Sequence, residues 1–143
     1  SSSLLSWLNG TYKNILDADI QEAISTTTYY FTQGYRGVNG SWNVLTRSDG
    51  IFQLSLTELG MSEDRANVEG SPLSIASILQ VAYINGEQTI QWTRSPVVGD
   101  ARNIWGVYNS NATSPLGYQA SGVSRPAFTL PSSFRLSDSQ IVA

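Results

Sequence analysis

Cysteine and histidine are both absent from this chain of 143 residues. The absence of cysteine excludes disulfide bonds, thiolate zinc sites and cysteine nucleophiles. The absence of histidine removes the usual general base near neutral pH, the most frequent transition-metal ligand and the central member of a serine-protease triad. Because only carboxylate chemistry is left, we expect a protein that is not an enzyme and that uses no metal or cofactor.

Charged side chains are also scarce, at 13% of the residues against the usual quarter. Lys13 is the single lysine, and the formal net charge is -3. Nucleic-acid binding requires a clustered positive patch, so this composition argues against nucleic acid as a partner. The chain has no run of about 18 apolar residues, which predicts that it has no transmembrane helix. Its polarity comes mainly from uncharged residues, as is common in β-rich proteins.

An amphipathic helical pattern occupies the chain from Leu4 to Ile24. Its apolar residues recur every three or four positions and therefore share one stripe: Leu5, Leu8, Tyr12, Leu16, Ile20 and Ala23. A lone helix of this length is marginal in water, so the stripe needs a covering surface. That surface could be the later part of the chain or the same segment of neighbouring subunits. We expect the second, with the first five residues of the stripe forming the subunit interface.

The course of this helix at Gly10 is left open, because glycine inside a helix costs about 1 kcal/mol relative to alanine. The helix could continue through Gly10, or Asn9-Gly10 could end a first helix. A second helix would then begin near Asp19, with Glu22 completing a capping box. In both cases the pattern changes to β-branched and aromatic residues after Ser25. The sequence therefore predicts a helical stalk at 1–24 and a β domain at 25–143.

The dipeptide Asp49-Gly50 predicts a β-hairpin between runs 42–47 and 51–56. Favoured two-residue hairpin turns need positive φ at both central positions, which Asp-Gly tolerates. Apolar and polar residues alternate along 51–56, so one face of that strand should be buried and the other exposed to solvent. The charged segment 60–72 that follows is expected to be an exposed loop.

Asn85-Gly86 predicts a second hairpin, between 78–84 and 88–93. Its first arm is apolar on both faces and is expected to lie centrally in the fold. Further strands are expected at 103–108, 127–130, 134–136 and 140–142. About eight or nine strands, hairpin connections and no intervening helix predict a mainly β fold, an antiparallel jelly-roll sandwich rather than a parallel sheet.

Aromatic residues fall into two groups. Core packing is expected of the tryptophans in predicted strands, which are Trp42, Trp92 and Trp105. Stacking on sugars is open to the tyrosines in or beside loops, which are Tyr35, Tyr108 and Tyr118. Many of the acids stand beside turns, as do Asp49, Asp100 and Asp138, and turn chemistry explains them without a glycosidase pair.

Arginines outnumber lysines seven to one, and the planar guanidinium is suited to bidentate capture of carboxylates. Arg36, next to Tyr35 in a glycine-rich loop, and Arg125, in an irregular late segment, could therefore meet at a subunit crevice. We predict that they bind a small carboxylate or an acidic sugar there. The alternative is that these arginines are solvated and pair weakly with nearby acids such as Asp49 or Glu63.

The run from Leu4 to Tyr12 leading into strand 26–32, together with the predicted hairpin at 42–56, resembles the C-terminal knobs of tail needles from short-tailed, P22-like phages. The resemblance implies a homotrimer whose knob is a tumour-necrosis-factor-like (TNF-like) jelly roll on a triple-stranded coiled coil.

Such a knob would lie outside the cell, on the virion at the tip of the phage tail. Its partners would be the rest of the needle, the tail machine and the host cell surface or outer membrane. It would contact or help penetrate the host envelope, as part of the needle that plugs the tail channel. Two alternatives are a lectin-like carbohydrate-binding module and a secreted trimeric ligand of the TNF or C1q type.

Overall fold

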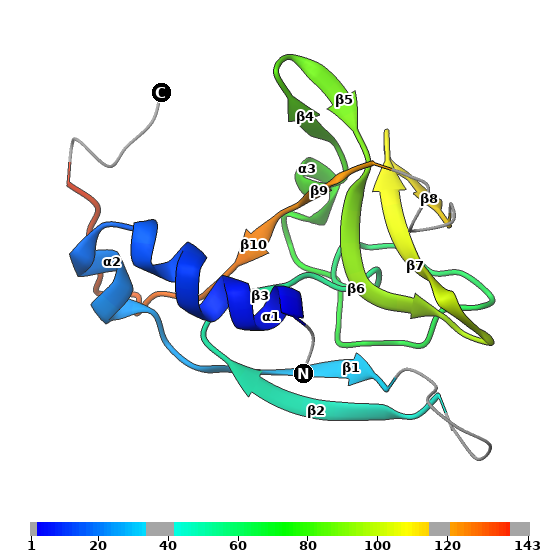
Figure 1. Ribbon diagram of the computed structural model, residues 1–143, viewed down its shortest axis with the longest axis horizontal. Coiled ribbons are helices and arrows are strands. Elements are labelled where there is room, and N and C mark those ends of the chain that lie inside the picture. Colours follow the sequence, from blue (N-terminus) through cyan, green and yellow to red (C-terminus); the bar gives the residue numbers. More distant parts are fainter. Residues whose placement is uncertain (1–2, 34–41, 115–120, 138–143) are drawn as a thin grey trace. The chain divides into compact units, whose positions relative to one another are not determined.

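A computed structural model of the chain describes residues 3–33, 42–114 and 121–137 (Figure 1). The chain divides into two compact units. Unit 1 consists of Ser1–Thr27, Asp49–Phe52 and Phe128–Ala143, and unit 2 consists of Thr28–Ser48 and Gln53–Ala127. Each unit therefore combines segments that are distant in sequence.

Unit 1 begins with the predicted helical segment, which forms two helical pieces. The first piece runs through α1 (Ser3–Trp7), the π-helical turn η1 (Leu8–Tyr12) and the 3-10 turn η2 (Lys13–Ile15), and the second is α2 (Ala18–Ala23). The prediction of helix is confirmed, but a continuous helix from Leu4 to Ile24 is wrong. The interruption falls at Leu16, whose extended backbone (φ -75°, ψ 158°) ends the first piece.

Of the two alternatives at Gly10, the helix that continues through it is confirmed, and a first helix that ends at Asn9-Gly10 is wrong. Gly10 lies inside η1, and no atom lies within 4 Å of the place where its β-carbon would be. The residue that precedes α2 is Asp17, not Asp19, and its side chain makes no capping hydrogen bond. Asp19 instead accepts a hydrogen bond from the neighbouring Ile20 N–H at 2.9 Å. The capping box predicted for Asp19 and Glu22 is therefore wrong.

Asn9 connects the first helical piece to the 49–52 segment of unit 1. Its Nδ2 donates to the carbonyl oxygen of Ile51 at 2.7 Å, and the Ile51 N–H donates to Asn9 Oδ1 at 2.9 Å. A β-carbon on Gly50 would lie 3.3 Å from Asn9 Oδ1 and 3.4 Å from Ile24 Cγ2. Gly50 therefore allows a close approach, and its φ is not positive.

The hairpin predicted around Asp49-Gly50 is wrong. β2 (Val44–Asp49) pairs with β1 (Thr27–Thr32), whereas β3 (Phe52–Gln53) pairs with β10 (Pro126–Ala127). The solvent-exposed face predicted for 51–56 is also wrong at Ser55, which is 0% exposed. The hairpin fails because β3 pairs with β10, which is far away in the sequence, and Ser55 is buried with its hydroxyl donating to the Glu69 carbonyl.

Unit 2 contains a four-stranded sheet with the order β8-β7-β6-β9. Its strands are β6 (Gln91–Val97), β7 (Asp100–Tyr108), β8 (Asn111–Thr113) and β9 (Val123–Ser124). β6 and β8 both run antiparallel to β7, which confirms the strand predicted at 103–108. β9 pairs with β6 in parallel, with Gln91 opposite Val123. The sheet is therefore antiparallel apart from this short edge pairing, which the sequence did not predict.

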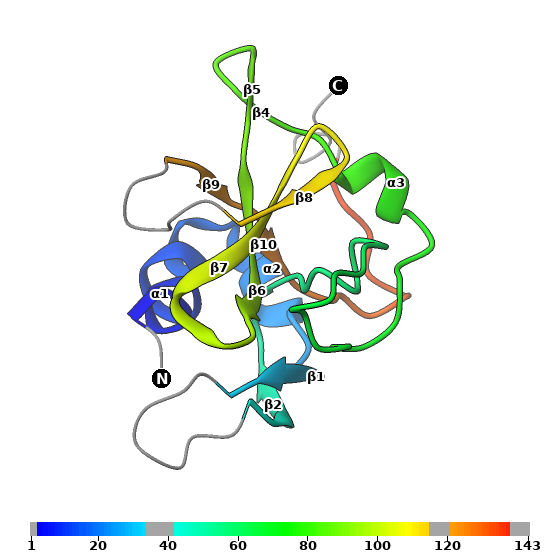
Figure 2. The same ribbon diagram turned by 90° about the vertical axis from the view of Figure 1, so that its right-hand side faces the viewer.

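The Asn85-Gly86 hairpin is confirmed. β4 (Ala82–Ile84) and β5 (Glu87–Thr89) pair in antiparallel fashion, and Asn85 and Gly86 have φ of 51° and 80°. A helical turn, α3 (Ala76–Leu79), occupies the start of the arm that was predicted to be a strand. The central position predicted for this arm is wrong, because Tyr83 is 61% exposed and the hairpin extends away from the sheet of unit 2 (Figures 1 and 2).

The core of unit 2 lies beside the β6–β7 pair. Its buried residues are Leu56, Leu59, Val97, Trp105 and Val107. Core packing is thus confirmed for Trp105, while Trp92 is half-buried in β6 and Trp42 is half-buried outside any strand.

The mainly β fold with a short N-terminal helical segment is confirmed. The strand predicted at 134–136 is wrong, because a turn bond from Phe134 N–H to the Pro131 carbonyl (2.9 Å) lies there. The strand predicted at 140–142 lies outside the described residues. Among the helices that the structure describes, none is long and apolar enough to cross a membrane.

Candidate functional site

The five apolar residues predicted to form a subunit interface differ in burial. Leu8 is only 1% exposed in the single chain. The other four are half-buried: Leu5, Tyr12, Leu16 and Ile20. Leu8 is therefore already covered without a second subunit, and the part that the others take in assembly stays a prediction.

Of the residues predicted to bind an anion, Tyr35 and Arg36 lie outside the described residues. Arg125 is half-buried. Its Nη1 donates to the Leu79 carbonyl and its Nη2 to the Val81 carbonyl, both at 2.9 Å. A carboxylate at Arg125 would have to compete with these two main-chain oxygens, so the anion site stays a prediction without geometric support here.

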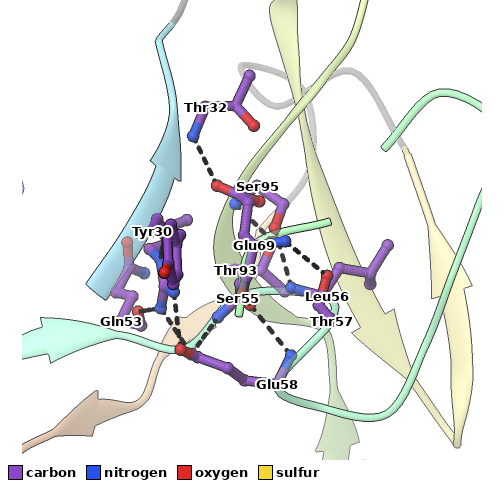
Figure 3. Close-up of polar contacts among 11 residues, drawn as sticks. Tyr30, Thr32, Gln53, Ser55, Leu56, Thr57, Glu58, Glu69, Thr93 and Ser95 are labelled. Atoms are coloured by element: carbon purple, nitrogen blue, oxygen red, sulfur yellow. Dashed lines mark hydrogen bonds and ion pairs between the residues drawn. The ribbon is translucent and has the colours of Figure 1, made fainter. Parts of the chain in front are cut away.

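Arg94 and Glu58, whose side chains are only 9% and 13% exposed, form an ion pair in unit 2. Figure 3 shows Glu58 among the polar contacts around it. Arg94 Nη1 and Nη2 reach the two carboxylate oxygens at 2.6 and 2.8 Å, a bidentate arrangement. The same guanidinium donates to the carbonyls of Tyr30 (2.9 Å) and Gln53 (2.7 Å). It also lies over the ring of Tyr29, 4.7 Å from the centroid. The Arg94 side chain thus connects β6 to β1, to β3 and to Glu58 in the segment after β3.

Glu69 is the second buried carboxylate of this cluster, and it is 0% exposed. Its Oε2 accepts the main-chain N–H of Thr32 at 2.7 Å, and its carbonyl accepts the Ser55 hydroxyl at 2.7 Å. The exposed loop predicted for 60–72 is therefore wrong at this residue. Within residues 3–33, 42–114 and 121–137, Glu69 Oε1 and the Thr32 hydroxyl oxygen have no hydrogen-bond partner.

Burial raises the pKa of the Glu69 carboxyl above its ordinary value of 4.5. The nearby Ser95 side chain, the Thr32 N–H and the positive charge of Arg94 oppose this rise without cancelling it. The carboxyl therefore takes up a proton more readily in the folded chain than in the unfolded chain.

We expect this proton to make stability depend on pH. Above pH 4.5 the folded chain holds a proton at Glu69 that the unfolded chain has lost, so the free energy of unfolding falls as pH rises toward the raised pKa. Glu69→Gln, which cannot ionise, should abolish this part of the fall. Urea unfolding of both proteins from pH 4 to pH 8 checks it. If the two profiles run parallel, the pKa of Glu69 does not change on folding.

Three further acids were predicted to belong to turns. Asp100 fits the turn interpretation, because its Oδ1 accepts the Arg102 N–H at 3.0 Å, and this bond lowers the pKa of Asp100. Asp49 ends β2, and Asp138 lies outside the described residues. In the part of the chain that the structure describes, no three acidic residues cluster closely enough to hold a metal ion. Through the bonds of Arg94 and Glu69 described above, the polar cluster connects β6 to β1 and β3, and Glu69 to β1.

A depression of about 500 Å³ lies at the β7–β8 hairpin of unit 2. Its lining residues are Ile90, Tyr108, Asn109, Asn111, Ala112 and Thr113. Tyr108 is 45% exposed, and it was one of the tyrosines singled out for sugar stacking. The asparagines and the threonine were not foreseen as site residues. The sequence feature that could have indicated them is Asn109-Ser110. These two residues form a turn with φ of 48° and 62°, which brings the end of β7 next to the start of β8.

Comparison with known proteins gives a family but no function. No curated protein and no solved structure matches the chain significantly. Residues 1–132 match the model of a family described as a domain of unknown function, DUF6273. The match spans most of the sequence and includes all of unit 2. The chain therefore belongs to the DUF6273 family.

Proposed function

We propose that this chain is a non-enzymatic binding domain that works as a homotrimer, as the distal knob of a phage tail needle. In this proposal it acts outside the cell, on the virion, where it contacts or helps penetrate the host envelope. Its partners are the rest of the needle and the tail machine, and its strands belong to a TNF-like jelly roll completed in the trimer.

Apolar side chains left exposed in the helical segment of unit 1 carry this proposal. Ile15 is 73% exposed and Trp7 is 46% exposed, although both belong to the first helical piece. Single exposed apolar residues are normal, but two large ones in one short helical piece suit a surface that another subunit covers. Covering each would contribute roughly 1.5–3 kcal/mol.

A non-enzymatic role is supported by how the acids are used. Glu58 is bound to Arg94 through both carboxylate oxygens. Glu69 is buried and accepts a main-chain N–H of β1. Both carboxyl groups are thus engaged in contacts within the fold, and the chain offers no histidine to take over a proton.

Light scattering coupled to size exclusion tests the assembly. We expect the protein at micromolar concentration to have three times the mass of one chain. The double variant Trp7→Ser/Ile15→Ser should shift toward the mass of a single chain, because both exposed apolar contacts are removed.

Tyr83→Ser is the matched control for this experiment, because Tyr83 is 61% exposed but belongs to β4 in unit 2. It should leave the mass unchanged. A single-chain mass for the unaltered protein, with normal circular dichroism, would rule out the trimeric knob.

A further inference from the structure

We propose that the open face of the β7–β8 hairpin binds a neutral saccharide, with the Tyr108 ring as the stacking surface and Asn109, Asn111 and Thr113 as its polar contacts. This site lies wholly within unit 2. It goes beyond the knob proposal and does not depend on the oligomeric state.

The register of the hairpin places these side chains on one face. Tyr108 is opposite Asn111, and Gly106 is opposite Thr113. The intervening pair is Val107 and Ala112: Val107 is 0% exposed, and Ala112 packs against the core. Because successive residues of a strand point to opposite faces, Tyr108, Asn111 and Thr113 lie on the face away from that core.

Gly106 makes room for the apolar part of the site. A β-carbon at Gly106 would lie 2.6 Å from Cγ2 of Ile90, closer than any real contact. The missing side chain therefore allows Ile90 to lie against β7, where it lines the depression together with Tyr108. An apolar surface next to a half-exposed aromatic ring suits the C–H face of a sugar ring, because both are dehydrated without loss of hydrogen bonds.

The polar groups at the rim are available for hydroxyl groups. In the ranges that the structure covers, the Asn109 amide, the Thr113 hydroxyl and the Tyr108 hydroxyl make no hydrogen bond. Asn111 Nδ2 donates to the Asn109 carbonyl at 2.9 Å, which orients this amide and leaves its Oδ1 as an acceptor. Amides and hydroxyls both donate and accept, as sugar hydroxyl groups do.

Charge and size decide the class of sugar. None of the six lining residues is charged, so the site offers an acidic sugar no counter-charge. A volume of about 500 Å³ falls within the range of roughly 300–1,000 Å³ that small-molecule sites occupy. A neutral monosaccharide, or the terminal residue of a longer neutral glycan, fits both conditions.

Nuclear magnetic resonance titration of the intact chain tests the proposal. The probes are glucose, galactose, mannose and N-acetylglucosamine, with sialic acid as the charged comparison. We expect at least one neutral sugar to shift the side-chain amide signals of Asn109 and Asn111 in a saturable manner. Tyr108→Ser should weaken that binding by about tenfold or more, whereas Tyr108→Phe, which keeps the ring, should lose only a few-fold.

Tyr83→Ser serves again as the matched control, because it removes an exposed tyrosine from a different hairpin of unit 2. It should bind the sugar as the unaltered chain does. The proposal is overturned if no neutral sugar binds a folded sample, if sialic acid is preferred, or if Tyr108→Ser binds unchanged. The measured mass of the same samples shows separately whether the trimer has formed.

Discussion

Arg94→Met is expected to lower the free energy of unfolding by about 3–5 kcal/mol, the usual result of removing one partner from a buried ion pair. The variant leaves the Glu58 carboxylate, whose side chain is 13% exposed, without its bidentate partner. It also removes the donors to the carbonyls of Tyr30 and Gln53. Methionine keeps most of the apolar volume, so lost packing contributes little. Urea unfolding, followed by circular dichroism at pH 7, measures the loss.

The control for this experiment is Arg102→Met. Arg102 pairs with Asp100 at 3.3 Å, but its side chain is 72% exposed, and solvent screening leaves such exposed pairs little effect on stability. Combining Arg94→Met with Glu58→Gln should recover part of the stability, because no charge is then left buried. Equal losses for Arg94→Met and Arg102→Met would show that the Arg94–Glu58 pair does not hold unit 2 together.

Asn9→Leu is expected to have the second large effect. It leaves the N–H and the carbonyl of Ile51, a residue that is 0% exposed, without their side-chain partner. Each unsatisfied buried group costs about 1–3 kcal/mol. The melting temperature should fall, and hydrogen exchange at the Ile51 amide should quicken by more than the global change explains.

Asn14→Leu is the matched control, because Asn14 belongs to the same helical piece but is exposed. A surface substitution of this kind usually changes stability by less than about 0.5 kcal/mol. If Asn9→Leu is no more harmful than Asn14→Leu, the Asn9–Ile51 bonds do not stabilise unit 1.

The contacts of Arg94 also affect the proposed saccharide site. Arg94 belongs to β6, and β6 pairs with β7, the strand that carries Tyr108. A binding surface on one strand of a firmly held pair keeps its geometry without a ligand, which reduces the entropy lost on binding. In this proposal the contacts of Arg94 support the strand pair that carries the hairpin face.

Local features of the chain could be read from the sequence alone. The Asn85-Gly86 hairpin was predictable because positive φ at two adjacent positions is a property of those residues themselves. The same holds for the helical character of the first segment and for the strand around Trp105, where the spacing of apolar residues is decisive. Tyr108 could be singled out because it stood beside a turn.

Only the tertiary structure decided which distant segments meet. Gly50 looked like a turn glycine, yet it is needed because Asn9 and Ile24 approach it closely. Glu69 stands in a charged stretch that looked exposed, but its carboxylate accepts the N–H of Thr32, far earlier in the chain.

Nothing in the local pattern distinguishes such residues from solvated ones, because burial depends on the partner that folding brings to them. The pairing of Arg94 with Glu58 and the parallel addition of β9 were beyond the sequence for the same reason. Composition thus determined that the chain has no cysteine or histidine chemistry, and residue types and spacing determined the local turns. Long-range contacts determined which polar groups hold segments of the fold together and which stay open to a ligand.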